Sequence, residues 1–361
     1  MSVDDFTVYA FYNNKGGVGK TTICSNAVAL YAARHPTTQV LVLDMCPQAN
    51  VSQFLLGGGP VGFQTNQRLQ LQAARKNIVG FIDWLLKGNS GFTSLNTSYR
   101  VRVAQYNPAI PDNVYLVAGD SFLESLSLAL NYAVINPANM LAWEEYMTAP
   151  RRLCAEEFDK AKYDNLRVFI DCNPSFSIYT QMALLSADHL IVPMMADFTS
   201  VEGIKGIFMM LYGEYPSPAL QKYAQNVVTF AKQVKSFELA VPTIYELVFN
   251  NYTSNLGVAK AYDSLKAELV AFSYDQFLKL PQYFATSSPA PRTLQEWTKT
   301  YVSDVKDFHT AGKVSATLGI PLEQLPLRSS YRMPDGDTVN LPPSNYTQAV
   351  QDIRKFVGKI D

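Results

Sequence analysis

Asn14-Lys15-Gly16-Gly17-Val18-Gly19-Lys20-Thr21-Thr22 is the stretch that decides the fold. An apolar, aromatic segment over residues 6–12 precedes it, and residues 21–34 follow with alanine, leucine and valine at helical spacing. The end of the stretch matches the pattern G-x-x-x-x-G-K-[ST], in which a glycine-rich loop between a strand and a helix holds phosphates. Asn14 occupies the position of the first glycine, and asparagine tolerates a positive φ better than most residues. The stretch therefore predicts a nucleotide-binding loop.

Each part of this loop has a predicted contact with the nucleotide. The glycines leave backbone N–H groups free to surround phosphate oxygens, and the N-terminus of the following helix adds partial positive charge. Lys20 is expected to reach the β- and γ-phosphates, and the Thr21 hydroxyl is expected to join the shell of a Mg²⁺ ion. ATP and Mg²⁺ are the expected ligands. The residues predicted to bind the nucleotide here are Gly16, Gly17, Val18, Gly19, Lys20, Thr21 and Thr22.

Further wholly apolar segments predict the rest of a sheet. They cover residues 40–43, 166–170, 189–193 and 244–249. Because these segments lack an alternation of period two, they fit parallel strands that helices bury on both faces. The predicted fold is a doubly wound α/β domain with a mostly parallel sheet, as in P-loop NTPases.

Composition limits the class of protein. The chain has 361 residues, is 48% hydrophobic and carries a formal net charge of -1, which argues against a protein that coats nucleic acid with positive charge everywhere. Four widely spaced cysteines and three histidines predict neither a disulfide scaffold nor a zinc site, and they favour the cytoplasm. Cys46 and Cys172 each follow a predicted strand, and two small buried thiols are favoured over a redox switch. No apolar run approaches the roughly 18 residues that a bilayer span requires.

Two regions lie outside the regular alternation of strands and helices. Residues 57–115 begin with Gly-Gly-Gly-Pro and are expected to form an insertion, for which partner recognition is the suggested role. Residues 325–344 are rich in proline, glycine and polar residues and are expected to form a loop. A helix is predicted over 345–359, with an apolar face that fits docking against the core better than a membrane anchor. The whole of residues 1–361 is expected to form a single domain, with the loop and helix of residues 325–361 at its end.

From Lys15 to Thr21 the loop also matches K-G-G-x-G-K-[ST], and here the chain resembles the ParA/MinD group of deviant Walker ATPases. The resemblance implies a SIMIBI-like P-loop fold and an ATPase in which Lys15 and Lys20 act on the phosphates. In that group the additional lysine, here Lys15, crosses a dimer interface to the partner's nucleotide. The resemblance therefore implies a homodimer that forms with ATP, because a ligand that binds the dimer better than the monomer favours the dimer.

The segment after the second predicted strand departs from the group at one position. Asp44-Met45-Cys46-Pro47-Gln48-Ala49-Asn50 resembles the group's D-x-D-P-Q-G-N sequence, but Cys46 replaces the second aspartate. That aspartate is associated with positioning the attacking water, and a thiol is a poor substitute for a carboxylate in this role. Hydrolysis is therefore expected to be slow, or to be organised by another group such as Asp44.

A third segment resembles the group's Mg²⁺-binding turn. Asp171-Cys172-Asn173-Pro174-Ser175 is similar to its D-x-P-P-S sequence, and Asp171 is expected to hold Mg²⁺ through water. The predicted metal-binding residues are Thr21, Asp44 and Asp171. The resemblance also places adenine near Asn250 and Asn251 and near residues 303–308, although a polar turn at the strand end explains the asparagines nearly as well.

The resemblance implies a ParA-type ATPase that partitions or positions DNA together with a ParB-like adaptor. An N-terminal helix-turn-helix domain is not expected, because the first predicted strand begins within the first ten residues. Nonspecific DNA binding would need a basic patch shared across the dimer. Its candidates, each of which an ordinary solvated charge also explains, are Arg100, Arg102, Arg328, Arg332, Lys355 and Lys359.

Two other functions stay open from the sequence. One is a nucleotide-gated protein that positions a protein or membrane cargo, as MinD-like relatives do, with membrane binding disfavoured by the predicted docking of the last helix. The other is an ATP-dependent enzyme such as an amidoligase or a nitrogenase-reductase-like protein. The latter needs cluster-binding cysteines whose spacing the four cysteines do not match.

Overall fold

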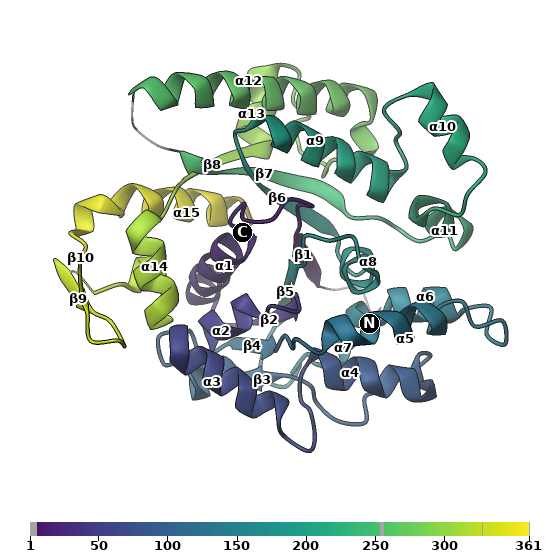
Figure 1. Cartoon of the computed structure of the whole chain (residues 1–361), viewed down its shortest axis with the longest axis horizontal. Helices are drawn as coiled ribbons and strands as arrows, with labels where there is room; N and C mark the ends of the chain where they lie inside the picture. Colours follow the sequence, from purple (N-terminus) through teal and green to yellow (C-terminus); the bar gives the residue numbers. More distant parts are fainter. Residues whose placement is uncertain (1–5, 253–255, 327, 361) are drawn as a thin grey trace.

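A computed structural model of the chain describes residues 6–252, 256–326 and 328–360. Its centre is an eight-stranded sheet with the order β3-β4-β2-β5-β1-β6-β7-β8, in which only the β3–β4 pair is antiparallel (Figure 1). The strands of this sheet are β1 (Thr7–Phe11), β2 (Thr38–Met45), β3 (Val101–Arg102), β4 (Val114–Val117), β5 (Asn165–Cys172), β6 (His189–Met195), β7 (Thr243–Tyr252) and β8 (Val302–Lys306). The predicted doubly wound fold is confirmed.

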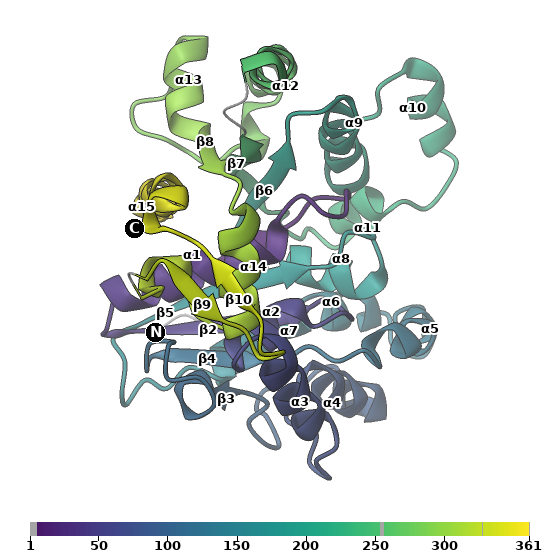
Figure 2. The same cartoon turned by 60° about the vertical axis from the view of Figure 1, so that its left-hand side comes forward.

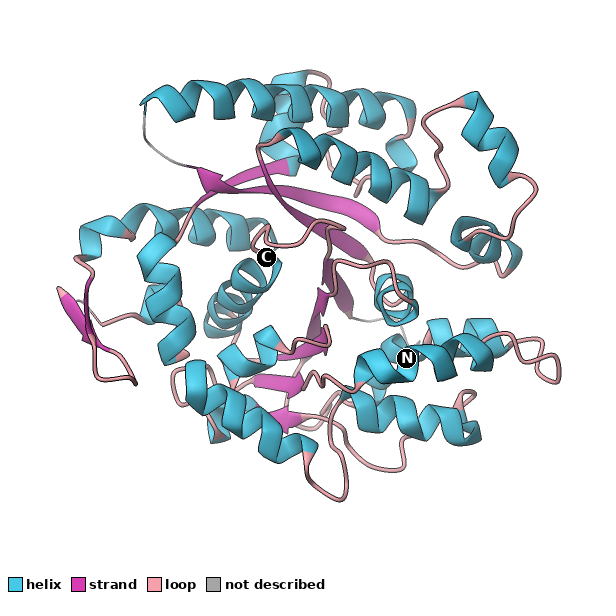
Figure 3. Ribbon diagram, viewed as in Figure 1, coloured by secondary structure: helices cyan, strands magenta, loops and turns pink. Residues whose placement is uncertain are grey.

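Helices cover both faces of the sheet, and the strands run between them as a middle layer (Figure 3). The α-helices are α1 (Lys20–Arg34), α2 (Asn50–Leu55), α3 (Gly59–Gln70), α4 (Ile78–Trp84), α5 (Leu123–Ala133), α6 (Ala142–Met147), α7 (Ala149–Glu156), α8 (Ile178–Leu185), α9 (Phe198–Ile207), α10 (Pro218–Ala224), α11 (Phe230–Ser236), α12 (Leu256–Lys279), α13 (Leu294–Tyr301), α14 (His309–Leu318) and α15 (Thr347–Ile360). Short 3-10 or π turns are η1 (Leu85–Asn89), η2 (Val103–Gln105), η3 (Phe208–Tyr212), η4 (Pro281–Tyr283), η5 (Leu322–Gln324) and η6 (Pro343–Asn345).

The core has two halves because successive side chains of a strand point to opposite faces. Val8 and Ala10 of β1 pack into the half formed with α4 to α9, α12 and α13. Tyr9 and Phe11 pack into the half formed with α1, α2 and α15. Full burial of a side chain such as valine or phenylalanine contributes about 1.5–3 kcal/mol to the stability of the fold. This two-sided burial is the physical reason for the continuous apolar runs in the sequence.

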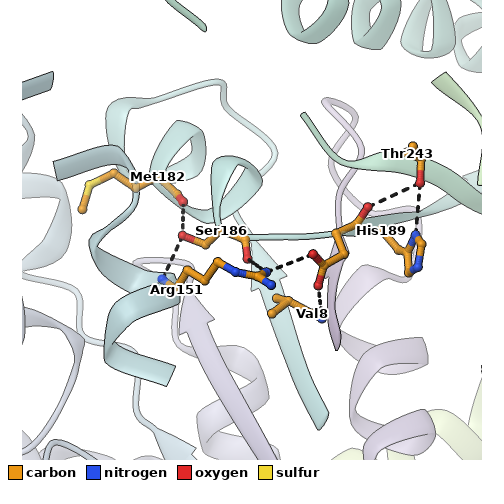
Figure 4. Close-up of polar contacts among 7 residues, drawn as sticks. Val8, Arg151, Met182, Ser186, His189 and Thr243 are labelled. Carbon is orange, nitrogen blue, oxygen red and sulfur yellow. Dashed lines mark hydrogen bonds and ion pairs between the residues drawn. The ribbon is translucent and has the colours of Figure 1, made fainter. Parts of the chain in front are cut away.

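A polar network fixes the edge of the sheet opposite the glycine-rich loop. The carboxylate of Asp188, just before β6, accepts hydrogen bonds from the Val8 N–H at 2.8 Å and from Arg151 at 3.0 Å. The Arg151 backbone N–H also bonds the Ser186 hydroxyl, so α7, α8, β1 and β6 meet there (Figure 4). His189 and Thr243 join β6 to β7 in the same network at 3.1 Å. The strands therefore start from a common anchor, and their carboxyl ends meet at the other edge.

The C-terminal part of the chain differs from expectation in one respect. Residues 325–344 are not only loop, because β9 (Ser330–Arg332) and β10 (Thr338–Asn340) form an antiparallel hairpin (Figure 2). The following helix α15 docks on the core as predicted, and its buried residues are Ala349, Ile353, Phe356, Val357 and Ile360. Within the described ranges, no helix combines the length and apolarity that crossing a membrane would need.

Two regions add structure to the sheet, namely the predicted insertion of residues 57–115 and the segment between β7 and β8, which the sequence did not single out. Residues 57–115 contain α3, α4 and the edge strand β3, which pairs with β4. Between β7 and β8 lie α12 and α13, whose aromatic residues surround the buried Trp297. These additions sit on the sheet rather than apart from it.

Candidate nucleotide-binding site

Two glycines in the left-handed region shape the loop between β1 and α1. Gly17 has a φ of 75° and Gly19 a φ of 86°. A Cβ atom at Gly19 would also overlap the side-chain amide of Asn250. Both the positive φ and this overlap therefore disfavour any residue other than glycine at position 19. Asn14 is not among the described residues with positive φ. The expectation that asparagine is needed here for its tolerance of a positive φ was therefore wrong.

Asparagine side chains brace the loop instead. Asn13 donates from Nδ2 to the Pro193 carbonyl at 2.8 Å, and its Oδ1 accepts the Lys15 N–H at 2.9 Å. Asn14 lies against α9, where a Cβ at Gly206 would be 2.5 Å from its amide nitrogen. The sequence analysis missed Asn13, although an asparagine directly before a glycine-rich loop and the glycine pair Gly203 and Gly206 in a helix were visible signals.

The Lys20 ammonium group lies inside the loop. Its Nζ donates to the carbonyl oxygens of Lys15 at 2.9 Å and Asn13 at 3.2 Å. Burial lowers the pKa of its ammonium group. The lysine is therefore held at the centre of the loop, where an anionic ligand would stabilise its charge.

Lys15 forms an ion pair within its own chain, with the carboxylate of Asp197. Asp197 also caps α9, since it accepts the Ser200 N–H at 3.0 Å and the Thr199 hydroxyl at 2.8 Å. Although partial burial opposes it, the hydrogen bonds from Lys15, Thr199 and Ser200 keep the pKa of Asp197 below its usual range. Asp197 was not predicted from the sequence, because nothing in the sequence links it to a residue 182 positions away.

Two buried carboxylates stand opposite each other on neighbouring strands. Asp44 of β2 and Asp171 of β5 are register partners. The Thr21 hydroxyl donates to Oδ2 of Asp171 at 2.7 Å, while Oδ1 of Asp171 is buried without a hydrogen-bond partner. Burial and then the charge of Asp44 raise the pKa of Asp171 to about 7. An orphaned carboxylate oxygen beside a threonine hydroxyl fits the oxygen donors that Mg²⁺ prefers.

Asp44 is engaged differently from Asp171. Its oxygens accept the Cys46 N–H at 3.1 Å and the N–H and hydroxyl of Ser52 at 3.0 and 2.6 Å. Burial raises its pKa to about 6, against the effect of these hydrogen bonds. Gly119 leaves room for the carboxylate, because a Cβ there would be 2.6 Å from Asp44 Cγ. Roles for Asp44 in catalysis and in Mg²⁺ binding stay predictions.

Cys46 lies beside these carboxylates with a buried thiol. Burial, followed by the charge of Asp44, raises its pKa to about 12, so the thiol is neutral at physiological pH. Cys172, at the end of β5, is buried as well, and all four cysteines are free thiols. The expectation of small buried cysteines is confirmed.

The predicted adenine contacts are arranged less simply. Asn250 donates to the Val18 carbonyl at 3.3 Å, so it contacts the loop backbone. The side chain of Asn251 lies outside the described residues. Residues 303–306, expected in a loop, belong to β8, and the Ser303 hydroxyl bonds the buried Glu246 at 2.5 Å. The assignment of residues 303–306 to a loop was wrong because the strand continues until Lys306, whereas the adenine contacts stay predictions.

A cavity of about 360 Å³ borders the start of α1 on the side of α2 and α14. Close backbone packing forms one wall, since a Cβ at Gly59 would be 2.7 Å from the Thr317 carbonyl oxygen. The Gly-Gly-Gly-Pro segment was the available signal for this contact. The residues that line the cavity are Thr21, Thr22, Ser25, Asn26, Asn50, Gln53, Phe54, Gly59, Gly312, Ser315, Ala316 and Thr317.

Three of the six basic residues proposed as candidates for DNA binding form ion pairs within the chain. Arg100 pairs with Glu157 at 3.1 Å and lies 4.2 Å from the centre of the Tyr115 ring. Arg102 pairs with Asp112, and Lys359 pairs with the buried Glu246 at 2.5 Å. The other three are exposed on the β9 segment and on α15, and they are Arg328, Arg332 and Lys355.

Comparison with known proteins agrees with this geometry. The AAA domain family (AAA_31) matches residues 6–212. The chromosome partitioning protein ParA of Myxococcus xanthus is 26% identical over 250 residues, which cover 64% of this chain and 73% of that protein. The chromosome-partitioning ATPase Soj of Treponema pallidum is 24% identical over 287 residues, covering 72% of this chain and 96% of that protein. A Cyanothece McdA–ATP complex has the same fold, with a TM-score of 0.53 at 13% identity over 98% of this chain and 97% of that chain.

Proposed function

Because the chain belongs to the AAA domain (AAA_31) family and is a P-loop ATPase of the ParA/MinD group, we propose that it is an ATP-dependent dimerising switch that positions DNA. The observation that carries the proposal is the contact of Thr21 with Asp171 beside the buried Lys20. Two relatives bear names that assign them to chromosome partitioning, which supports DNA as the cargo.

The residues of the loop divide the work of holding ATP. The N–H groups of residues 16–19 and the N-terminus of α1 bind phosphate oxygens. Lys20 supplies a cation from inside the loop. Thr21 and Asp171 would hold Mg²⁺, whose charge stabilises the charge that develops on the phosphate oxygens. The neutral thiol of Cys46 orients water poorly, so hydrolysis is slow.

Dimerisation assigns a role to Lys15 at the edge of the loop. In the group that the chain belongs to, the corresponding lysine reaches the nucleotide of a second subunit. The Lys15 side chain is partly exposed and pairs with Asp197, so it can exchange an acceptor in its own chain for a phosphate in another. A ParB-like adaptor would then trigger hydrolysis and release, in the cytoplasm and on the nucleoid.

The test is retention of nonspecific duplex DNA with and without ATP and Mg²⁺. Wild type is expected to retain DNA only with ATP, and a change from about 50 mM to about 200 mM salt is expected to remove most of the binding. Lys20→Ala should abolish the ATP effect. The Arg328→Gln/Arg332→Gln variant should lose DNA retention while its ATP turnover stays at the wild-type level. Absence of ATP-dependent retention at low salt would contradict DNA as the cargo.

A protein cargo is the second candidate. The observation that favours it is the occupation of Arg100, Arg102 and Lys359 by internal partners, which leaves few of the expected cations for DNA. ATP-dependent dimers without DNA retention would support this candidate. A membrane cargo is disfavoured because α15 buries its apolar face, so no cosedimentation with liposomes is expected.

A further inference from the structure

Helix α5 carries apolar side chains that the fold does not use. Its inner face buries Leu123 and Leu130. Its outer face presents Leu128 and Tyr132, which are 65% and 68% exposed, and Ile135, in the turn directly after the helix, is 68% exposed. Leu128 and Tyr132 are four residues apart, which places them on one side of the helix. Figure 2 shows α5 at the periphery of the molecule, outside α8, so the outer face points away from the core.

The connection to α6 extends this surface. Met140 is 88% exposed and Leu141 is 55% exposed. We call the five side chains Leu128, Tyr132, Ile135, Met140 and Leu141 the α5 stripe. Five large apolar side chains exposed within residues 128–141 are typical of a binding surface.

The segment that carries the α5 stripe contains acidic residues and no basic ones. Residues 121–150, which carry the α5 stripe, contain three acidic residues, Glu124, Glu144 and Glu145, and neither lysine nor arginine. Glu124 is exposed one turn before Leu128 on the same face of α5. Two basic side chains from neighbouring elements are paired with carboxylates, since Arg75 lies 3.8 Å from Asp120 and Lys87 lies 2.6 Å from Asp83. The surface therefore attracts a partner with positive charge.

Hydrogen bonds connect the α5 stripe to the nucleotide site. The Tyr179 hydroxyl donates a hydrogen bond to the Glu124 carboxylate at 2.5 Å, and it accepts a hydrogen bond from Nδ2 of Asn173 at 2.8 Å. Asn173 lies two residues after Asp171, in the turn that follows β5. A chain of three hydrogen-bonded side chains therefore joins α5 to the turn that follows Asp171.

We propose that the α5 stripe is the docking surface for a basic amphipathic segment of a partner protein. The complementary chemistry is an apolar face for Leu128, Tyr132 and Ile135, flanked by lysine or arginine for Glu124. A second copy of this chain fits worse, because a symmetric contact would bring two acidic surfaces together. The inference deepens the proposed function, since it rests on a switch that answers to a partner.

The experiment measures binding of labelled peptides to the full chain by fluorescence anisotropy. The probe is a helical peptide of about 18 residues with leucine on one face and lysine on the other. A scrambled peptide of the same composition and a peptide with glutamate in place of lysine are the references. The lysine peptide is expected to bind, and both references are expected to bind at least about tenfold more weakly.

Matched protein variants locate the binding. Leu128→Gln/Ile135→Gln removes two side chains of the α5 stripe, while Tyr223→Gln/Val228→Gln removes two exposed apolar side chains near α10. The first variant should bind the lysine peptide at least about tenfold more weakly than wild type does, and the affinity of the second should differ from that of wild type by less than about twofold. Equal effects, no binding to wild type, or equal binding of the glutamate peptide would overturn the proposal. Wild-type association without nucleotide that Leu128→Gln/Ile135→Gln abolishes would overturn it too, because the surface would then be a self-interface.

A second readout separates this inference from the proposed function. Without peptide, Leu128→Gln/Ile135→Gln is expected to keep wild-type ATP turnover and ATP-dependent DNA retention. If DNA retention is absent from wild type while the lysine peptide binds the α5 stripe, the DNA function fails and the docking surface stands. If DNA retention is present and the peptide result is negative, the docking surface fails alone.

Discussion

A neutral thiol lies where the ParA/MinD group uses a carboxylate to position water. The Cys46 thiol is buried beside Asp44, and its pKa of about 12 keeps it protonated. We expect Cys46→Asp to raise steady-state phosphate release by about tenfold or more, because a positioned base contributes about 10²–10⁴ in rate. Cys172→Ser is the control, since it removes a neighbouring thiol without adding a carboxylate, and its rate should not rise. Equal rates for wild type and Cys46→Asp would show that Cys46 does not limit hydrolysis.

Gly19 and Gly16 offer a paired test of the loop. An alanine at Gly19 would adopt a φ of 86° and overlap the Asn250 amide, whereas a Cβ at Gly16 meets nothing within 4 Å. Gly19→Ala is therefore expected to lower the free energy of unfolding by about 1–3 kcal/mol. Gly16→Ala should stay within about 0.5 kcal/mol of wild type. Urea denaturation without nucleotide measures both, and equal midpoints would refute the strain assigned to Gly19.

The carboxylate of Asp171 predicts a pH dependence of stability. Its pKa is about 7 in the folded protein, against 3.8 for an unperturbed aspartate. Between these values the folded state binds more protons than the unfolded state, so stability falls as pH rises, by at most about 1.4 kcal/mol per pH unit. Asp171→Asn should flatten this slope in urea titrations from about pH 4 to about pH 7 without nucleotide or Mg²⁺. Equal slopes for wild type and Asp171→Asn would show that the pKa of Asp171 is not raised in the folded protein.

At the scale of elements, a buried ion pair joins α15 to β7 and adds to the packing of its apolar face. Lys359 donates to Glu246 at 2.5 Å, and Glu246 is fully buried on β7. Removal of the lysine leaves an uncompensated buried charge, so Lys359→Ala is expected to destabilise the protein by about 2–4 kcal/mol. Lys355→Ala, on the exposed side of the same helix, should change stability by less than about 0.5 kcal/mol. In thermal or urea unfolding, similar losses for both variants would contradict a specific role for the pair.

The elements differ in how far the sequence alone predicts them. Strands such as β2 are predictable because burial on both faces leaves a continuous apolar run. The hairpin of β9 and β10 was not predicted, because strands of three residues among prolines and glycines carry no periodic signal. The helices between β7 and β8 were not predicted because α12 has no single apolar face that its sequence marks clearly.

The site shows the same division. Gly19, Lys20, Thr21 and Asp171 were predictable because the loop and the strand end have fixed sequence patterns. Asp197 was not, because its role comes from a contact between loops at the ends of β1 and β6, and only the folded sheet brings them together. Long-range pairs of this kind leave no spacing signal in one sequence.

At the scale of the whole molecule, we predict that the pair of Lys15 and Asp197 opposes the proposed dimerisation. A lysine that is to contact the nucleotide of a second chain must first leave this carboxylate in its own chain. Asp197→Asn keeps a side chain that can cap α9 but removes the charge that holds Lys15. We therefore expect Asp197→Asn to dimerise at a lower protein concentration, by about threefold to tenfold, because a lost ion pair of this exposure is worth about 1 kcal/mol. Lys15→Gln should dimerise less than wild type.

Sedimentation velocity with a nonhydrolysable ATP analogue and Mg²⁺ measures the shift, and the nucleotide-free proteins serve as controls. A dimer of Asp197→Asn without nucleotide would mean that Asp197 blocks a contact unrelated to ATP. Superimposable association curves for wild type, Asp197→Asn and Lys15→Gln would mean that Lys15 does not leave its own chain. If the order is Asp197→Asn, wild type and then Lys15→Gln, one lysine connects nucleotide binding in the loop to the assembly of two chains, and Asp197 sets the concentration at which that assembly begins.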